Sequence, residues 1–470
     1  MIGLPPFLSF SENERILQLK ILMIILRTVK NISSLNIAAS VLLFLAAILA
    51  AVVANSSLSP VYQDFLLQEL HLRIGNFNLF SHGGHPLKMI EFINDCLMTV
   101  FFLAVGLEIK RELLVGELSS VRKAALPFIA ACGGMVVPVV IYALSVASGT
   151  PETRGMAIPM ATDIAFSLGV LSLLGKRVPL SLKIFLTAFA VVDDIGGILV
   201  IALFYSADVA YGYLIAAAVL YVFLYYMGKF GVTQKIFFLF FGVIIWYLFL
   251  QSGIHSTISG VILAFVIPAR PRLDAGKYIE RIRDIIGEFP VSKSDNIVLT
   301  NAQIATLKQV ERASDYVISP LQSLEDNLHG AVSFVILPLF AFANAGVVFS
   351  GSGSIVGDVS IAVAAGLLLG KFLGIYLFTW LAVKSGVALM PAGMNWKNIA
   401  GVSLLGGIGF TVSLFIANLS FADEYPELLN QAKALAPEIV RWRRHIHENP
   451  EVSAVLPNTC AYVTEELKKM

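Results

Sequence analysis

Charged residues are scarce in this chain. Aspartate, glutamate, lysine and arginine make up 14% of its 470 residues, whereas an average soluble domain is about a quarter charged. Hydrophobic residues make up 57%, and the mean hydropathy is +0.80. This composition leaves too little polar surface to coat a soluble globule of this size. We therefore expect a protein embedded in a lipid bilayer.

Cysteine and net charge are also low. The three cysteines, Cys96, Cys132 and Cys460, lie far apart in a spacing that suits neither a disulfide framework nor a zinc site. The formal net charge of +1 provides no bulk attraction to nucleic acid, so no nucleic-acid partner is expected. We also expect no cofactor, no resident metal ion and no enzymatic activity.

Long apolar runs take the place of charge. Only helices and closed barrels satisfy their backbone groups in lipid, and barrel strands alternate apolar with polar residues. Here the apolar runs are continuous, as in "ASVLLFLAAILAAVV" (39–53). A helical span needs about 20 such residues. We therefore predict an all-α polytopic membrane protein with eleven spans, at 35–56, 86–109, 124–146, 155–174, 179–204, 209–228, 234–251, 253–269, 330–350, 357–383 and 397–421.

The positions of lysine and arginine predict the orientation of the spans. Positive charge collects at the N-terminus and in the loops after the even-numbered spans, with Arg73 and Arg154 as exceptions, which places the N-terminus in the cytoplasm. The chain then divides into a cytoplasmic segment with an amphipathic helix (1–34), a membrane domain (35–421) that contains a cytoplasmic insert (270–328), and a polar tail (422–470). The tail would emerge outside, although its "RWRR" suits the cytoplasm better.

Ionisable residues inside spans are costly in lipid and mark functional sites. Asp193 and Asp194 are adjacent in the fifth span, Asp163 lies in the fourth and Lys371 in the tenth. Adjacent residues diverge by about 100° around a helix, so we expect one aspartate to face a water-filled cavity and the other a neighbouring helix. Carboxylates this close in a low dielectric need a counter-cation or protons. Such a site can hold Na+ or protons in competition, with Lys371 as the internal partner of a carboxylate.

Simpler interpretations of these groups stay open. The aspartates and Lys371 could form a structural ion pair without a transport role. His255 begins the eighth span, where a histidine is commonly a satisfied interfacial polar group. Glu108 and Glu112 share one helix face with cationic residues between them, a pattern that also fits a solvated helix end.

Glycine or proline interrupts two of the predicted spans. The fourth reads "GMAIPMATDIAFSLG", with Pro159 ahead of Thr162 and Asp163, and the eleventh reads "GVSLLGGIGFTVSLF", with three glycines ahead of Thr411. A matching pair of interrupted spans indicates an inverted-repeat transporter with two crossed discontinuous helices at its substrate site. Asp163 would balance the positive half-helix ends there, and Lys371 the negative ends.

Several ordered motifs resemble NhaA-type Na+/H+ antiporters: "VGLEIKRELL", "MATDIAFSLGVLSLLGKRVPLSLKIFLTAFAVVDDIGG", "SGIHSTISGVI", "LPLFAFANAG", "LLLGKFLGI" and "GGIGFTVSLFIA". The likeness runs from about residue 35 to residue 433. It implies a bacterial inner-membrane antiporter that exports Na+ or Li+ in exchange for protons, electrogenically and with activation at alkaline pH. It also suggests a homodimer joined through the outside loop at 57–85.

The resemblance assigns roles by motif position. Asp194 resembles the main cation ligand, and Asp193 resembles the acid paired with Lys371. Thr162 and Asp163 resemble the polar break of an unwound helix. The residues that match positions linked to the pH response are Glu108, Glu112, His255 and Glu325.

The sequence departs from the family pattern in three places. Phe372 follows Lys371 where the family has a proline, and the insert at 270–328 is longer than usual. The family has a twelfth span after "ELLNQAK", whereas here the chain continues into a segment similar to the opening helix of amidohydrolase metallopeptidases of the hippurate-hydrolase type. Its His445 and His447 do not share a helix face, so they make a poor metal pair.

Two alternatives to a working antiporter follow from this tail and from the spans. One is a membrane-anchored fragment of an antiporter–amidohydrolase fusion with impaired or no transport. The other is a structural or signalling membrane protein that has lost transport, against which the charges inside the spans argue.

Overall fold

The computed structural model describes residues 37–421, except for 75–76, 83–84, 148–149, 175–177, 206–208, 271–274, 288–299, 348–356 and 392. Residue contacts divide the chain into two units, Met1–Ile416 and Ala417–Met470. Almost all of the described helices belong to the first unit. The amphipathic helix expected within 1–34 and the tail expected at 422–470 lie outside the described residues.

Apolar helices occur at all eleven predicted positions within the described part of the chain. Four are continuous and long enough to cross a membrane: Ile37–Ala54, α5 (Val121–Ser145), α7 (Leu180–Phe204) and α8 (Tyr211–Lys229). Two are shorter, α9 (Lys235–Leu250) and α10 (Thr257–Val266). The predicted all-α polytopic class is therefore confirmed.

Three further long spans each contain one π-helical turn. The first joins α3 (Met89–Phe92), η1 (Ile93–Leu97) and α4 (Met98–Val115). The second joins α13 (Pro320–Ala331), η5 (Val332–Ile336) and α14 (Leu337–Asn344). The third joins α15 (Asp358–Ala365), η6 (Gly366–Gly370) and α16 (Lys371–Lys384). Phe372, which replaces the expected proline, continues the last of these helices and stacks on Tyr376.

The two interrupted spans are bent helix pairs. One consists of the 3-10 helix η3 (Pro151–Met160) and α6 (Ile164–Leu173), bent by 41°. The other consists of α17 (Trp396–Gly406) and α18 (Phe410–Ser420), bent by 40°. Pro159 lies in the last turn of η3, just before the first break, and Gly407 and Gly409 lie in the second break; both interrupt a continuous helix, as the sequence predicts.

The ninth span begins earlier than the sequence predicts. Its helix starts at Pro320 rather than at residue 330, so Glu325 lies on a helix that is long and apolar enough to cross a membrane. The start is set locally, because the Ser319 side chain accepts a hydrogen bond from the Gln322 N–H and a proline occupies the first helical position. The segment looked too polar for a span because Glu325 and His329 face an interior cavity instead of lipid.

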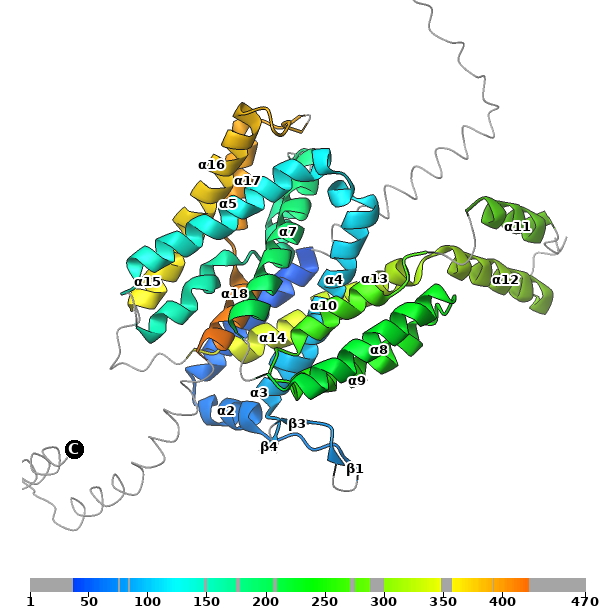
Figure 1. Cartoon of the computed structure of the whole chain (residues 1–470), viewed down its shortest axis with the longest axis horizontal. Helices are drawn as coiled ribbons and strands as arrows, with labels where there is room; N and C mark the ends of the chain where they lie inside the picture. Colours follow the sequence, from blue (N-terminus) through cyan, green and yellow to red (C-terminus); the bar gives the residue numbers. More distant parts are fainter. Residues whose placement is uncertain are drawn as a thin grey trace, which may run out of the picture. The chain divides into compact units, whose positions relative to one another are not determined.

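Two polar segments connect the spans. The loop at 57–85 contains α2 (Ser59–Leu67) and two small antiparallel hairpins, β1 (Arg73–Ile74) with β2 (Phe77–Asn78) and β3 (Ser81–His82) with β4 (His85–Pro86). The insert contains α11 (Ala275–Gly287) and α12 (Asn301–Val317), which pack on one another (Figure 1).

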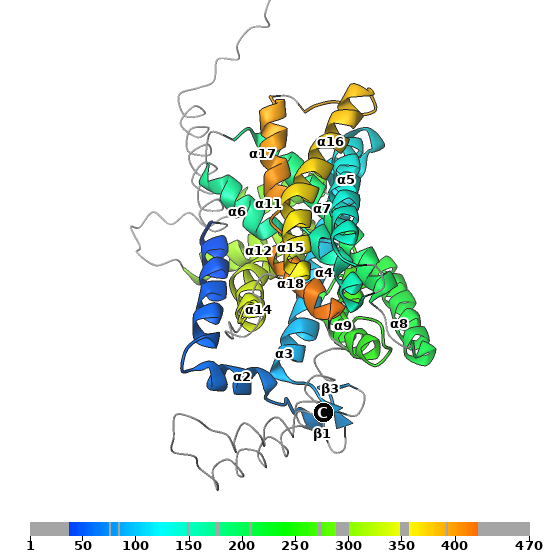
Figure 2. The same cartoon turned by 90° about the vertical axis from the view of Figure 1, so that its left-hand side faces the viewer.

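The helices form two groups, each around its own apolar core. In the first group, α5, α7, α16 and α17 surround Phe189, and α6 packs at its edge. In the second group, α4, α8, α9, α10 and α13 surround Phe238. The groups meet where Ile109 of α4 packs on Val191 of α7. Figures 1 and 2 show α5, α7, α16 and α17 side by side, with α4 next to α7.

Close backbone packing against α5 fixes the position of α16 along its helix axis. A Cβ atom on Gly133 of α5 would lie 2.3 Å from the carbonyl oxygen of Gly374, and one on Gly374 would lie 2.1 Å from the carbonyl oxygen of Gly133. Only glycine allows this approach at both positions. Because Lys371 begins α16 one turn before Gly374, the same contact sets the position of its ammonium group.

Candidate functional site

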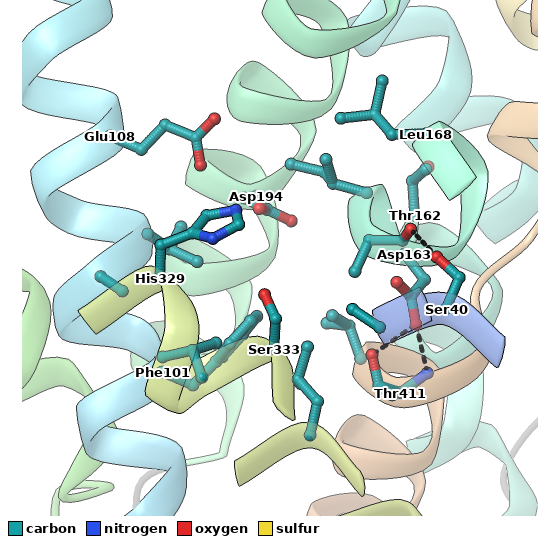
Figure 3. A pocket seen from close by; sticks show the side chains of 18 of the residues that line it. Ser40, Phe101, Glu108, Thr162, Asp163, Leu168, Asp194, His329, Ser333 and Thr411 are labelled. Atoms are coloured by element: carbon teal, nitrogen blue, oxygen red, sulfur yellow. Dashed lines mark hydrogen bonds between the residues drawn. The ribbon is translucent and has the colours of Figure 1, made fainter. Parts of the chain in front are cut away.

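A cavity of about 290 Å³ lies where the two helix groups meet the interrupted spans (Figure 3). Its walls come from the helix Ile37–Ala54 and from α4, α6, α7, α13, η5, α14 and α18. Apolar side chains make up part of the lining. The polar lining residues are Ser40, Glu108, Arg111, Thr162, Asp163, Asp194, Glu325, His329, Ser333 and Thr411.

Lys371 and Asp193 form a buried ion pair beside the cavity. The Lys371 Nζ donates hydrogen bonds to both carboxylate oxygens of Asp193, at 2.8 and 2.7 Å, and to the Thr162 hydroxyl at 3.0 Å. The Lys371 side chain is fully buried. Such a pair is stable only when hydrogen bonds satisfy its remaining atoms, which Thr162 helps to do.

Asp194 turns away from its neighbour and faces the cavity. Its carboxylate lines the cavity wall, and the residue is 8% exposed. In Figure 3, Glu108 and His329 lie on one side of Asp194, and Asp163 and Thr411 lie on the other. Among the residues that the structure describes, no salt bridge involves Asp194, because Lys371 is engaged with Asp193.

The Asp163 carboxylate joins the two half-helices that begin at the crossing. One oxygen caps α6 by accepting a hydrogen bond from the Phe166 N–H at 2.9 Å. The other accepts hydrogen bonds from the N–H and the hydroxyl of Thr411 in α18, at 3.1 and 2.6 Å. Both half-helices thus direct their positive N-terminal ends at one carboxylate.

Thr162 connects Lys371 with the negative C-terminal end of α17. The Thr162 hydroxyl donates to the Gly406 carbonyl at 2.8 Å and accepts from Lys371. Next to it, the Asp163 N–H donates to the Ile408 carbonyl at 2.7 Å. Charges and hydroxyls together therefore satisfy the backbone groups that the two breaks expose.

A charged group occupies the part of the cavity next to α13. Arg111 pairs with Glu325 at 2.8 Å and with Glu112 at 3.3 Å. Glu112 also accepts a hydrogen bond from the Glu117 N–H, and it is 8% exposed, so it does not occupy a solvated helix end. Glu108 and Glu325 line the cavity itself.

His255 lies apart from the other predicted site residues. It precedes α10, where its Nε2 is 3.5 Å from Asp95 and its Nδ1 is 2.8 Å from the Thr257 hydroxyl. Its ring packs edge-on against Phe415. His255 is not among the residues that line the cavity.

Sequence reasoning missed several polar residues at the cavity. His329 follows Glu325 by four residues and therefore shares its helix face, a spacing that could have indicated it. Thr411 lies two residues after Gly409 at the glycine break, but its hydrogen bond to Asp163 forms only when the two interrupted spans are folded against each other. The other missed lining residues are Ser40, Arg111 and Ser333.

The arrangement provides the ligands that a small monovalent cation prefers. Carboxylate, hydroxyl and backbone carbonyl oxygens are hard donors that suit Na+. Asp194 and Asp163 face one cavity of about 290 Å³, while the charge of Asp193 is compensated by Lys371. The cavity therefore combines uncompensated carboxylate charge with room for an ion or for protons.

Known proteins resemble this chain over most of its length. The family described as Na+/H+ antiporter 1 matches residues 30–436. A protein of Bacteroides thetaiotaomicron named Na(+)/H(+) antiporter NhaA is 75% identical over 411 residues, which cover 87% of this chain and 94% of that protein. Proteins with the same name from Phocaeicola vulgatus and Porphyromonas gingivalis are 62% and 48% identical, over 82% and 87% of this chain and 86% and 91% of theirs. The chain therefore belongs to the Na+/H+ antiporter 1 family.

Proposed function

We propose that this protein is a secondary active antiporter that exports Na+ in exchange for protons, with Asp194 as the principal group that binds both. The observation that carries the proposal is the division of the paired aspartates. Lys371 compensates Asp193, whereas Asp194 faces the cavity without a salt bridge among the described residues. A buried carboxylate in that position must bind either a cation or a proton.

Competition at this carboxylate couples the two flows. Na+ bound between Asp194 and Asp163 compensates one negative charge, and a proton on Asp194 does the same when Na+ has left. Each ligand lowers the affinity for the other by the same factor, which is ordinary thermodynamic linkage. Alternating access then carries Na+ in one direction and protons in the other.

The Lys371–Asp193 pair supports electrogenic exchange. Loss of a proton from Lys371 would leave Asp193 without its partner, so this pair provides a second titrating unit next to Asp194. Two protons can then return for each Na+ exported, and net charge moves across the membrane.

The charged groups away from Asp194 adjust activity to pH. Glu108, Glu112 and Glu325 share the field of Arg111, so protonation of any one of them changes the charge near the path to Asp194. His255 acts separately, through Asp95 and the start of α10. Exchange increases at alkaline pH as these carboxyl groups become charged.

The setting is the bacterial inner membrane, with the N-terminus in the cytoplasm, as the distribution of lysine and arginine indicates. Li+ has the same charge and ligand preference as Na+ and is a second substrate. The outside loop at 57–85, with its hairpins, is the contact surface of a homodimer in the lipid bilayer.

A second candidate function concerns the tail. The family match ends at residue 436, and the segment beyond it resembles the opening helix of amidohydrolase metallopeptidases. The chain would then be a membrane-anchored fragment of an antiporter–amidohydrolase fusion with impaired transport. Rescue of an antiporter-deficient bacterial strain from Na+ by the full chain would argue against this candidate.

The primary test is Na+-driven proton flux in everted membrane vesicles. Asp194→Asn should abolish the flux, because an amide cannot exchange a proton for Na+. The matched control is Asp358→Asn, an exposed aspartate in the first turn of α15, and it should exchange at the rate of the unmodified protein. Unchanged exchange in Asp194→Asn would overturn the assignment of this residue.

A further inference from the structure

The two interrupted spans leave carbonyl groups without helical partners. The last four carbonyls of any helix lack intrahelical hydrogen-bond donors, and in a membrane each unsatisfied group is costly. Here η3 ends at Met160 and α17 ends at Gly406, both inside the protein. The groups that donate hydrogen bonds to the carbonyl groups at these helix ends therefore determine how the two interrupted spans are held where they cross.

Two buried serines supply hydroxyl groups to these ends. The Ser167 hydroxyl in α6 donates to the Leu405 carbonyl of α17 at 2.9 Å, and the same carbonyl also accepts a hydrogen bond from the Ile408 N–H at 3.1 Å. The Ser413 hydroxyl in α18 donates to the Ile158 carbonyl of η3 at 2.8 Å. Ser167 is 0% exposed and Ser413 is 7% exposed.

The two bonds are reciprocal. Each serine lies in the first turn of the second half of its own span: the Ser167 N–H bonds the Asp163 carbonyl, and the Ser413 N–H bonds the Gly409 carbonyl. Each hydroxyl then satisfies the first half of the opposite span. Two hydrogen bonds therefore join the interrupted spans where they cross: one runs from α6 to α17, and the other runs from α18 to η3.

The hydrogen bonds of Ser167 and Ser413 differ in chemistry from those that Asp163 accepts. Its bonds to Thr411 involve a carboxylate that also lines the cavity, so bound Na+ or a proton competes for the same oxygens. A hydroxyl bonded to a backbone carbonyl has no titratable group near neutral pH. Its strength stays the same whether the site holds Na+ or protons.

We propose that Ser167 and Ser413 are positioning residues that keep the crossing in the geometry for Na+ binding while the charge on Asp163 and Asp194 changes. The inference rests on the proposed exchange function. It assigns the serines no contact with the ion. They act through Thr162 and Asp163, whose places depend on how α6 and α18 meet the opposite spans.

The test compares three serine-to-alanine variants in everted vesicles. Ser167→Ala and Ser413→Ala should each raise the KM for Na+ by about fivefold or more, because each removes a buried hydrogen bond that joins the two interrupted spans and thereby loosens the site. The maximal rate should change by less than about twofold, because Asp194 is untouched. Ser403→Ala is the matched control, since Ser403 is fully buried in α17 and donates to the Ile399 carbonyl of its own helix.

A binding measurement separates this inference from the proposed function. The thermal unfolding midpoint of the purified protein, recorded with and without Na+, reports binding without transport. The double variant Ser167→Ala/Ser413→Ala should lose most of the stabilisation by Na+, and Ser403→Ala should keep it. If the unmodified protein does not exchange, the proposed function fails while this comparison still decides the role of the serines. An unchanged KM and unchanged stabilisation in both serine variants, or an equal effect of Ser403→Ala, would overturn the inference.

Discussion

Asp193 and Asp194 are neighbours in sequence, yet they belong to regions with different electrostatics. Asp193 belongs to a closed unit in which Lys371 and Thr162 satisfy the charges and no exposed surface remains. Asp194 belongs to the cavity, whose charged group around Arg111 is partly exposed, with 34% of the Arg111 side chain accessible. Charges in the closed unit cannot be screened by water or salt, whereas those in the cavity can. Substitutions in the closed unit should therefore affect folding most, and those near Arg111 should affect ion access.

The largest effect on stability is expected from Lys371→Met. It leaves Asp193 buried without a partner, which costs about 3–5 kcal/mol of the free energy of unfolding. The double variant Lys371→Met/Asp193→Asn should recover most of this loss, because it removes the uncompensated charge. Thermal unfolding in detergent checks both variants. Lys384→Met, at the end of the same helix where the lysine lies over Trp380, serves as control. Equal loss in the single and double variants would contradict the account of a closed ion pair.

An intermediate effect is expected from Thr411→Val, which keeps the shape of the side chain but removes a hydroxyl from Asp163. A hydrogen bond to a charged group contributes about 1.5–3 kcal/mol, so the unfolding free energy should fall by that amount. Thr379→Val is the matched control, because the buried Thr379 hydroxyl has no hydrogen-bond partner among the described residues. That control should be neutral or stabilising. A larger loss in Thr379→Val than in Thr411→Val would be incompatible with this assignment.

The smallest effect on stability is expected from Arg111→Gln. The Arg111 side chain is 34% exposed, so water screens its ion pairs, and exposed ion pairs contribute about 0.2–1 kcal/mol. Transport should respond more clearly, since loss of this positive charge makes the cavity more negative and lowers the KM for Na+ by about two- to threefold at low ionic strength. The change should shrink as an inert salt is added. Destabilisation as large as that of Lys371→Met would show that the two regions do not differ as described.

The sequence predicts the membrane architecture well because lipid imposes one strong requirement on composition. Continuous apolar runs identify the helices, and a proline and a set of glycines identify the two breaks. The separation of Asp193 from Asp194 also follows from sequence, because adjacent residues on a helix face different directions. These features depend on local rules, so a single chain without relatives is enough to find them.

Other features depend on contacts that hydropathy cannot indicate. The start of α13 at Pro320 was missed because the polar residues of its first turns face a cavity and not lipid. The burial of Glu112 depends on Arg111 and on the turn after α4. The hydroxyl bonds of Ser167 and Ser413 cross between spans that are more than 200 residues apart in the chain. Serine in an apolar helix gives no signal that distinguishes such a bond from one to its own helix.

The most direct test of the account is whether Na+ and protons compete for Asp194. Na+ binding to the purified protein can be measured by calorimetry over a range of pH, together with the protons released on binding. The apparent Kd for Na+ should rise by about tenfold for each unit of pH decrease where one proton competes with Na+, and by up to about a hundredfold where Lys371 takes up the second proton as well. Asp194→Asn should show neither Na+ binding nor proton release. A Kd that does not change with pH, or Na+ binding without proton release in the unmodified protein, would contradict the central claim.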